Sequence, residues 1–114
     1  MNFIISGKNI DVTPGLRDAI EQKLGKLERY FTPETEIIVT LSVEKERQKI
    51  EVTIPTKVGI LRTEVEHEDL YAAIDLAIDK LEDQVRRQKT RLSRRHREKL
   101  ALSFVEQDNG KLDQ

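Results

Sequence analysis

The chain has 114 residues, of which 37% are hydrophobic and 36% are charged, with a formal net charge of −1 and no cysteine. This length suits one domain with a single modest core, and the charged fraction exceeds the about 25% of average domains. Absence of cysteine excludes disulfides, thiol chemistry and cysteine-based zinc sites, and no segment approaches the about 20 apolar residues that a membrane crossing needs. We therefore expect a soluble cytosolic protein with no membrane partner.

The N-terminal part of the chain predicts a strand followed by a helix. Residues 3–7 begin with three apolar residues, are partly β-branched and end at a glycine, which is typical of a short strand. Thr13 and Pro14 signal a helix start, because a threonine hydroxyl accepts from the free N–H groups there and proline at the first helical position loses no needed donor. Spacing of three or four predicts a helix to about Tyr30, ended by Pro33. Its apolar stripe comprises Leu16, Ile20, Leu24, Leu27 and Phe31.

Three consecutive strands are predicted next, because the hydrophobic period changes to two at Glu36. Residues at every second position over 37–43, 50–54 and 61–65 are apolar except Thr63, and the residues between them are polar except Ile38. The polar run 44–48 is expected to form a turn without glycine, and residues 57–59 a second turn. We therefore expect these three strands to form an antiparallel meander.

A second helix is predicted from Asp69, which can cap it, to about Lys99. From residue 101 the chain is mostly polar and without period. We therefore expect a domain over residues 1–100, followed over residues 101–114 by a flexible tail or the start of a linker.

The resulting order, β-α-β-β-β-α, predicts an α+β two-layer fold. Both helices need a surface against which to bury their apolar stripes, and one face of a four-stranded mixed sheet provides it. A right-handed crossover through the first helix places the first strand parallel to the second.

The strongest functional feature is a basic run near the end of the predicted second helix. From Arg86 to Lys99 there are eight Lys or Arg residues against the single acid Glu98, a local charge of +7, so the other hundred residues carry −8. The simplest interpretation, which needs no binding partner, is a solvated helix end at which the cations favourably face the helix dipole. Two features favour a nucleic-acid partner over a solvated helix end and over a membrane surface. The acids are too few to form i,i+4 salt bridges with the cations. Arginine, whose planar guanidinium suits phosphate oxygens, outnumbers lysine six to two. The candidate RNA-binding residues are Lys23, Lys26 and Arg29 on the first helix and Lys80, Arg86, Arg87, Lys89, Arg91, Arg94 and Arg95 on the second.

Catalysis has little support in the sequence. His67 and His96 are the only histidines, they lie far apart, and no phosphate-cradling glycine loop is present, so neither a metal nor another cofactor is expected. The few aromatic residues do not interleave with the basic run, so recognition of RNA backbone and shape is expected rather than base stacking. Engaging about six phosphates would give a salt slope on the order of −4 to −5.

Three segments, GKNIDVTPGLRDAIEQKLGKLERYF, KIEVTIP and HEDLYAAIDLAIDKLEDQVRRQKTR, resemble the bacterial ribosome hibernation-promoting factors, also called ribosome-associated inhibitors. The resemblance spans residues 1 to about 97. It implies a non-enzymatic protein, with a fold similar to double-stranded RNA-binding domains, that binds rRNA in the small-subunit channel and blocks mRNA and tRNA in stationary or stressed cells. The resemblance also implies which cations face rRNA: Lys23, Lys26, Arg29, Lys80, Arg86, Arg87, Lys89 and Arg91. Relatives often carry a basic residue at the position of Asp83, so this chain departs from the family pattern there.

The cluster Arg94, Arg95, Arg97 and Lys99 resembles the longer family form, in which a linker leads to a C-terminal domain that pairs two ribosomes. The 114 residues do not include such a domain, so the chain is expected to be either an N-terminal domain of the long form or a short member. Two rival functions are also compatible with the sequence. One is a generic double-stranded RNA-binding module without ribosome specificity, and the other is a protein-interaction domain.

Overall fold

A computed structural model of the chain describes the backbone of residues 1–57 and 59–106 and the side chains of residues 1–57 and 59–90. Its elements follow the predicted order, with a short 3-10 helix added after the first helix. The elements are β1 (Asn2–Lys8), α1 (Pro14–Leu24), η1 (Gly25–Tyr30), β2 (Glu36–Glu44), β3 (Arg47–Thr56), β4 (Gly59–His67) and α2 (Leu70–Glu106).

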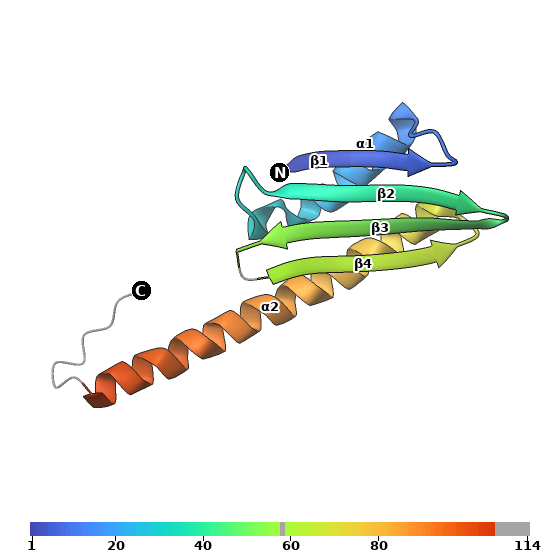
Figure 1. The fold of residues 1–114 in the computed structure, drawn as a ribbon. Helices are drawn as coiled ribbons and strands as arrows, with labels where there is room; N and C mark the ends of the chain where they lie inside the picture. The colour runs from blue at the N-terminus through green and yellow to red at the C-terminus, as the bar shows by residue number, and fades with distance from the viewer. Residues whose placement is uncertain (58, 107–114) are drawn as a thin grey trace. The chain divides into compact units, whose positions relative to one another are not determined.

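The four strands form one mixed sheet in the order β1-β2-β3-β4 (Figure 1). β1 runs parallel to β2, with Ile5 opposite Val39, and the other two pairings are antiparallel. The predicted parallel pairing and the antiparallel meander are therefore confirmed. Gly7 is required near the end of β1, because a Cβ at this position would lie 2.3 Å from the Ile10 carbonyl oxygen.

Helix α1 and residues 70–84 of α2 cover one face of this sheet (Figure 1). Side chains alternate accordingly: on β2, Ile37, Val39 and Leu41 are buried under the helices, whereas the residues between them are half-buried on the opposite face. The helices contribute the stripes that their spacing predicted, except for Phe31, which follows η1 in an extended conformation and is half-buried. The buried helical residues of this layer are Leu16, Ile20, Leu24, Leu27, Leu70, Ala73, Ile74, Ala77, Ile78 and Leu81. The α+β two-layer fold is thus confirmed.

Both predicted helix starts are capped by side chains. The Thr13 hydroxyl accepts a hydrogen bond from the Leu16 N–H at 3.2 Å, with Pro14 at the first helical position. The Asp69 carboxylate accepts from the Tyr71 N–H at 3.0 Å and so caps α2. Near that cap, the His67 Nδ1 accepts from the Asp69 N–H at 2.9 Å, which holds the junction between β4 and α2.

Two local predictions are corrected. The first helix is α-helical only to Leu24 and continues as a 3-10 helix to Tyr30. The turn between β2 and β3 is two residues long rather than five, because Glu44 pairs with Arg47 and the ladder extends to the end of the hairpin. The polar residues at the end of the hairpin can remain in the strands, because the outer face of the sheet is open to water. Lys45 adopts the positive φ of 57° that a two-residue turn needs.

The backbone of α2 continues to Glu106 rather than ending near Lys99. Contacts divide the chain into two compact units, residues 1–84 and residues 85–114. Residues 107–114 lie outside the described residues, so the flexible tail over 101–114 and the domain boundary at residue 100 stay predictions.

Candidate nucleic-acid interface

Three of the candidate RNA-binding residues lie at the end of the first helix, three positions apart. Lys26 and Arg29 are exposed and Lys23 is half-buried. A 3-10 helix repeats every 3.0 residues, so residues at i and i+3 eclipse one another. The 3-10 segment therefore aligns Lys26 and Arg29 on one side of η1. In an α-helix, which turns by about 100° per residue, residues three positions apart would not be aligned as closely.

Arg29 is held in place by the residue that follows it. Its guanidinium Nη2 donates to the Tyr30 hydroxyl at 2.8 Å, and its Cζ lies 4.9 Å from the centre of the Tyr30 ring, within cation–π range. These contacts restrict the arginine side chain and leave its positive charge uncompensated by a carboxylate. An ordered, exposed guanidinium suits bidentate binding of a phosphate.

Lys23 serves a second purpose in the fold. Its ammonium forms an ion pair with the Asp75 carboxylate on α2, so it links the two helices of the first unit. The pair is largely exposed, with 35% and 57% of the side chains accessible, and contributes at most about 1 kcal/mol. A role for Lys23 in RNA binding stays a prediction, as it does for the other candidates.

Cations on the open face of the sheet differ from those of η1, because most of them are paired. The described strands place four cations on the open face, and among these four only Lys8 has no ion pair. The partners lie diagonally across β3 and β4: Lys49 stands opposite Glu66 in the register, yet its ammonium is 3.5 Å from Glu64. The three pairs are Arg47 with Glu66, Lys49 with Glu64 and Arg62 with Glu51.

This diagonal ladder reduces the positive field of the sheet face. Within residues 1–57 and 59–90, by contrast, no ion pair involves Lys26, Arg29, Lys80 or Arg87. The cations available to a polyanion therefore lie mainly on the helices.

Charge changes sign along α2 at the boundary between the two units. Residues 70–84 carry four acids against Lys80 alone, a net charge of −3, whereas residues 85–99 carry eight cations and one acid. The acids Asp79 and Asp83 stand one and three positions from Lys80 and oppose an anion there. Lys80 is thus a weaker candidate than its exposure suggests.

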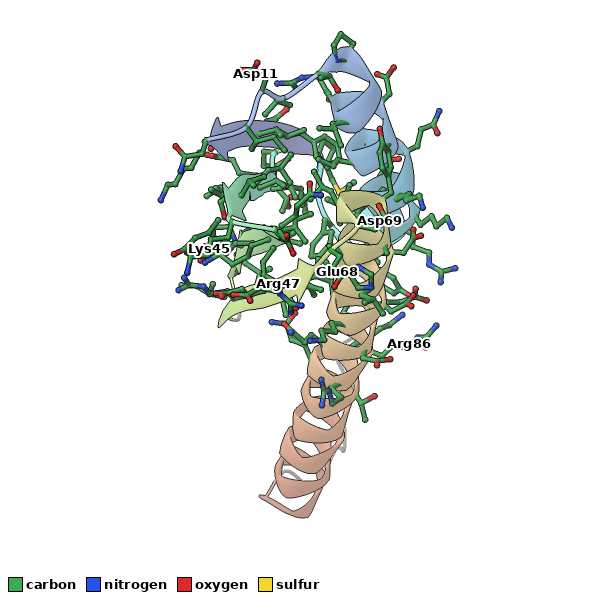
Figure 2. All side chains as sticks on the ribbon, turned by 90° about the vertical axis from the view of Figure 1, so that its right-hand side faces the viewer. Asp11, Lys45, Arg47, Glu68, Asp69 and Arg86 are labelled. Atoms are coloured by element: carbon green, nitrogen blue, oxygen red, sulfur yellow. The ribbon has the colours of Figure 1, made fainter. Side chains whose placement is uncertain are left out.

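In the second unit the structure describes the side chains at the start of the basic run. Arg86, Arg87 and Lys89 are exposed, and the Thr90 hydroxyl donates to the Arg86 carbonyl oxygen at 2.9 Å within the helix. Figure 2 labels Arg86 on α2. The predicted contacts Arg91, Arg94 and Arg95 lie outside the described side chains, although the helical backbone includes them.

Neither a metal centre nor a membrane span is found in the part of the chain that the structure describes. No group of three His, Asp or Glu side chains there is placed to hold a metal ion, and no helix there combines the length and apolarity that crossing a bilayer requires. His67 serves the start of α2, as noted above, and His96 lies outside the described side chains.

Sequence comparison identifies relatives over most of the chain. Residues 3–93 match the model of the family described as Sigma 54 modulation protein / S30EA ribosomal protein. The ribosome hibernation promotion factor of Bacillus subtilis (strain 168) is 49% identical over 108 residues, which cover 92% of this chain and 57% of that protein. The factor of the same name from Staphylococcus aureus (strain COL) is 45% identical over 102 residues, covering 87% and 54%. The chain thus spans about half the length of these relatives.

Solved structures share the fold. The N-terminal domain of Thermus thermophilus Protein Y has a TM-score of 0.71 and 41% identity, covering 76% of this chain and 98% of that one. A ribosomal subunit interface protein from Coxiella burnetii, at 24% identity, has a TM-score of 0.70 with 79% and 99% covered, and shows likeness of fold alone. The resemblance seen in the sequence is confirmed, and the chain belongs to the Sigma 54 modulation protein / S30EA ribosomal protein family, which includes ribosome hibernation promotion factors.

Proposed function

We propose that this chain is a bacterial, cytoplasmic ribosome hibernation factor that inhibits translation by occupancy. It binds rRNA in the decoding channel of the small subunit, where its bulk excludes mRNA and tRNA, and it catalyses no reaction. Family membership supports the ribosome as the partner, since two relatives at 45–49% identity are named ribosome hibernation promotion factors.

The observation that carries the proposal is the contrast between paired and unpaired cations. On the sheet, Arg47, Lys49 and Arg62 are neutralised by neighbouring carboxylates. On the helices, Lys26, Arg29 and Arg87 are exposed without an ion pair among the described residues, and Arg87 lies in the segment 86–99, which has eight cations and one acid. Such a distribution favours a polyanion, because each cation that meets a phosphate releases a condensed counterion.

A competition experiment with purified small subunits tests the occupancy mechanism. Subunits loaded with mRNA and initiator tRNA are expected to bind the chain poorly, and the chain, when added first, is expected to block tRNA binding. Simultaneous binding of all three would refute occupancy of the decoding channel.

The same assay separates the generic double-stranded RNA binder. An excess of duplex RNA of unrelated sequence is expected to leave the chain on the small subunits. Ready displacement by duplex RNA at equal phosphate concentration would favour the generic module, because electrostatic binding alone does not distinguish one duplex from another.

A further inference from the structure

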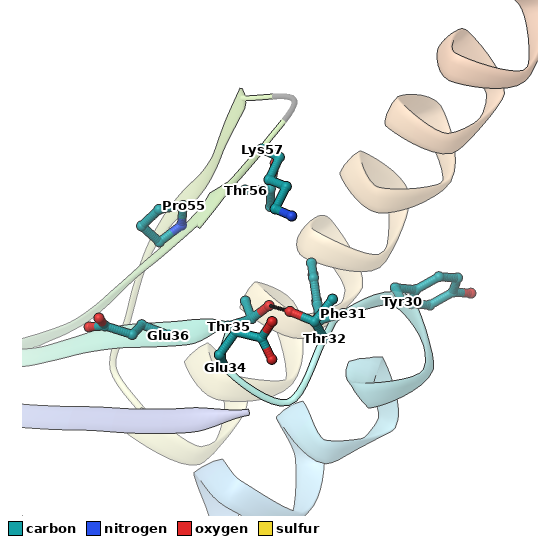
Figure 3. Close-up of a pocket in the computed structure, with 9 residues that line it drawn as sticks. All are labelled: Tyr30, Phe31, Thr32, Glu34, Thr35, Glu36, Pro55, Thr56 and Lys57. Atoms are coloured by element: carbon teal, nitrogen blue, oxygen red, sulfur yellow. Dashed lines mark hydrogen bonds between the residues drawn. The ribbon is translucent and has the colours of Figure 1, made fainter. Parts of the chain in front are cut away.

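A pocket of about 520 Å³ lies at the end of the sheet where β2 begins and β3 ends (Figure 3). The segment between η1 and β2 forms one side of it, and the last residues of β3 with the following turn form the other. Its volume falls in the range of small-molecule sites, about 300–1,000 Å³. All of the residues that define it belong to the first unit.

Two apolar rings, one aromatic and the other the saturated ring of a proline, form opposite sides of this pocket (Figure 3). The half-buried ring of Phe31 stands on one side and the exposed ring of Pro55 on the other (Figure 3). The Phe31 backbone is held at the end of η1, because its N–H donates to the Glu28 carbonyl oxygen at 3.1 Å. A planar group fits between two such surfaces better than a branched aliphatic one.

Polar groups on the rim restrict the charge of the occupant. The exposed carboxylates of Glu34 and Glu36 line the pocket and repel a phosphate inside it, while accepting hydrogen bonds from amino groups. The hydroxyls of Thr32 and Thr35, 3.0 Å apart, add neutral donors and acceptors. On the opposite rim, the exposed Lys57 provides one positive charge.

The pocket is continuous in sequence with the cationic end of the first helix. Tyr30 lines the pocket and also carries the Arg29 guanidinium against its ring. A nucleotide strand held at its phosphates by Lys26 and Arg29 therefore passes directly beside a pocket that accepts a neutral planar group and rejects a phosphate. The sequence hid this arrangement, because no aromatic residue lies within the basic run itself.

We propose that this pocket binds one unstacked nucleobase of the ribosomal RNA. The base packs between Phe31 and Pro55, its amino and ring nitrogen groups meet the carboxylates and threonine hydroxyls, and Lys57 faces the phosphate of the same nucleotide. This inference rests on the proposed function, since it takes its ligand from the ribosome. It adds a base-binding site to a surface that otherwise recognises only backbone charge and shape.

The test compares Phe31→Leu with the matched control Tyr71→Leu by measuring affinity for purified small subunits at several salt concentrations. Leucine keeps an apolar side chain at the half-buried position but removes the flat ring, and Tyr71 is an aromatic residue, 49% exposed, outside the pocket. Loss of base stacking is expected to weaken binding roughly five- to hundredfold. The salt slope is expected to stay unchanged, because stacking releases no counterion. Tyr71→Leu is expected to bind like the wild type.

Chemical probing of the rRNA gives a second readout that does not depend on affinity. At saturating protein, one unpaired base protected by the wild type and by Tyr71→Leu is expected to become reactive with Phe31→Leu. Wild-type affinity and an unchanged protection pattern for Phe31→Leu would overturn the inference while leaving the proposed function intact. Failure of the wild-type chain to bind small subunits would instead refute the proposed function itself.

The charge-removing pair Glu34→Gln with Glu36→Gln distinguishes a base from a basic side chain of a ribosomal protein. The glutamine carbonyl oxygens still accept hydrogen bonds from the amino groups of a base, while two negative charges near RNA phosphates are removed. A base-binding pocket is therefore expected to bind as well as the wild type or more tightly. A clear loss of affinity would show that the carboxylates bind a cation, and would overturn the inference.

Discussion

The pairing of cations predicts that two substitutions on η1 weaken ribosome binding, whereas two equivalent substitutions on the sheet do not. The first variant is Lys26→Gln with Arg29→Gln, and the matched control is Arg47→Gln with Lys49→Gln, so both lower the net charge from −1 to −3. Lys26 and Arg29 have no ion pair in the described structure, whereas both control residues face carboxylates within 3.8 Å.

The expected loss follows from counterion release. Each phosphate contact contributes about −0.7 to −0.9 to the slope of log K against log salt, which corresponds to about 5- to 8-fold in affinity at 0.1 M salt. Losing two contacts therefore weakens binding about 25- to 60-fold and makes the slope less negative by about 1.4 to 1.8. The control removes two exposed ion pairs, each worth about 0 to 1 kcal/mol of stability, and leaves the slope close to that of the wild type.

Sedimentation with purified small subunits at four or more salt concentrations measures both quantities, and thermal melting checks that each variant is folded. An equal loss of affinity in the two variants would refute the reasoning, because it would mean that only the total charge matters. An unchanged slope for Lys26→Gln with Arg29→Gln would likewise show that neither residue meets a phosphate.

Three further outcomes are expected. Arg86→Glu with Arg87→Glu leaves the fold intact but abolishes pelleting with ribosomes, and unchanged pelleting would show that the basic segment is only a solvated helix end. Thr13→Ala removes the hydroxyl that accepts from Leu16 and lowers the free energy of unfolding by about 1 kcal/mol in urea titration, whereas no shift in the urea midpoint would mean that the cap is replaced by water. Ile74→Ala empties a fully buried position between α2 and the sheet and costs about 2 to 5 kcal/mol by the same measurement, and a loss below 1 kcal/mol would contradict its place in the core.

The sequence determined the architecture because each element carries its own local signal. Apolar spacing of three or four predicted the helices, alternation predicted the strands, and Thr13 and Asp69 were identified as caps from their chemistry alone. The parallel pairing of β1 with β2 followed from a helix that crosses over between two neighbouring strands. The concentration of cations after Arg86 was equally visible, since it depends only on counting.

Only the tertiary structure decided which cations are neutralised. Lys49 and Glu64 are 15 positions apart in sequence, and the register that brings them together depends on a two-residue turn that the polar run 44–48 did not reveal. The ion pair between Lys23 and Asp75 likewise requires the packing of two helices. Local patterns specify hydrogen bonding and burial within an element, whereas charge compensation depends on distances between elements, and those distances exist only after the chain has folded.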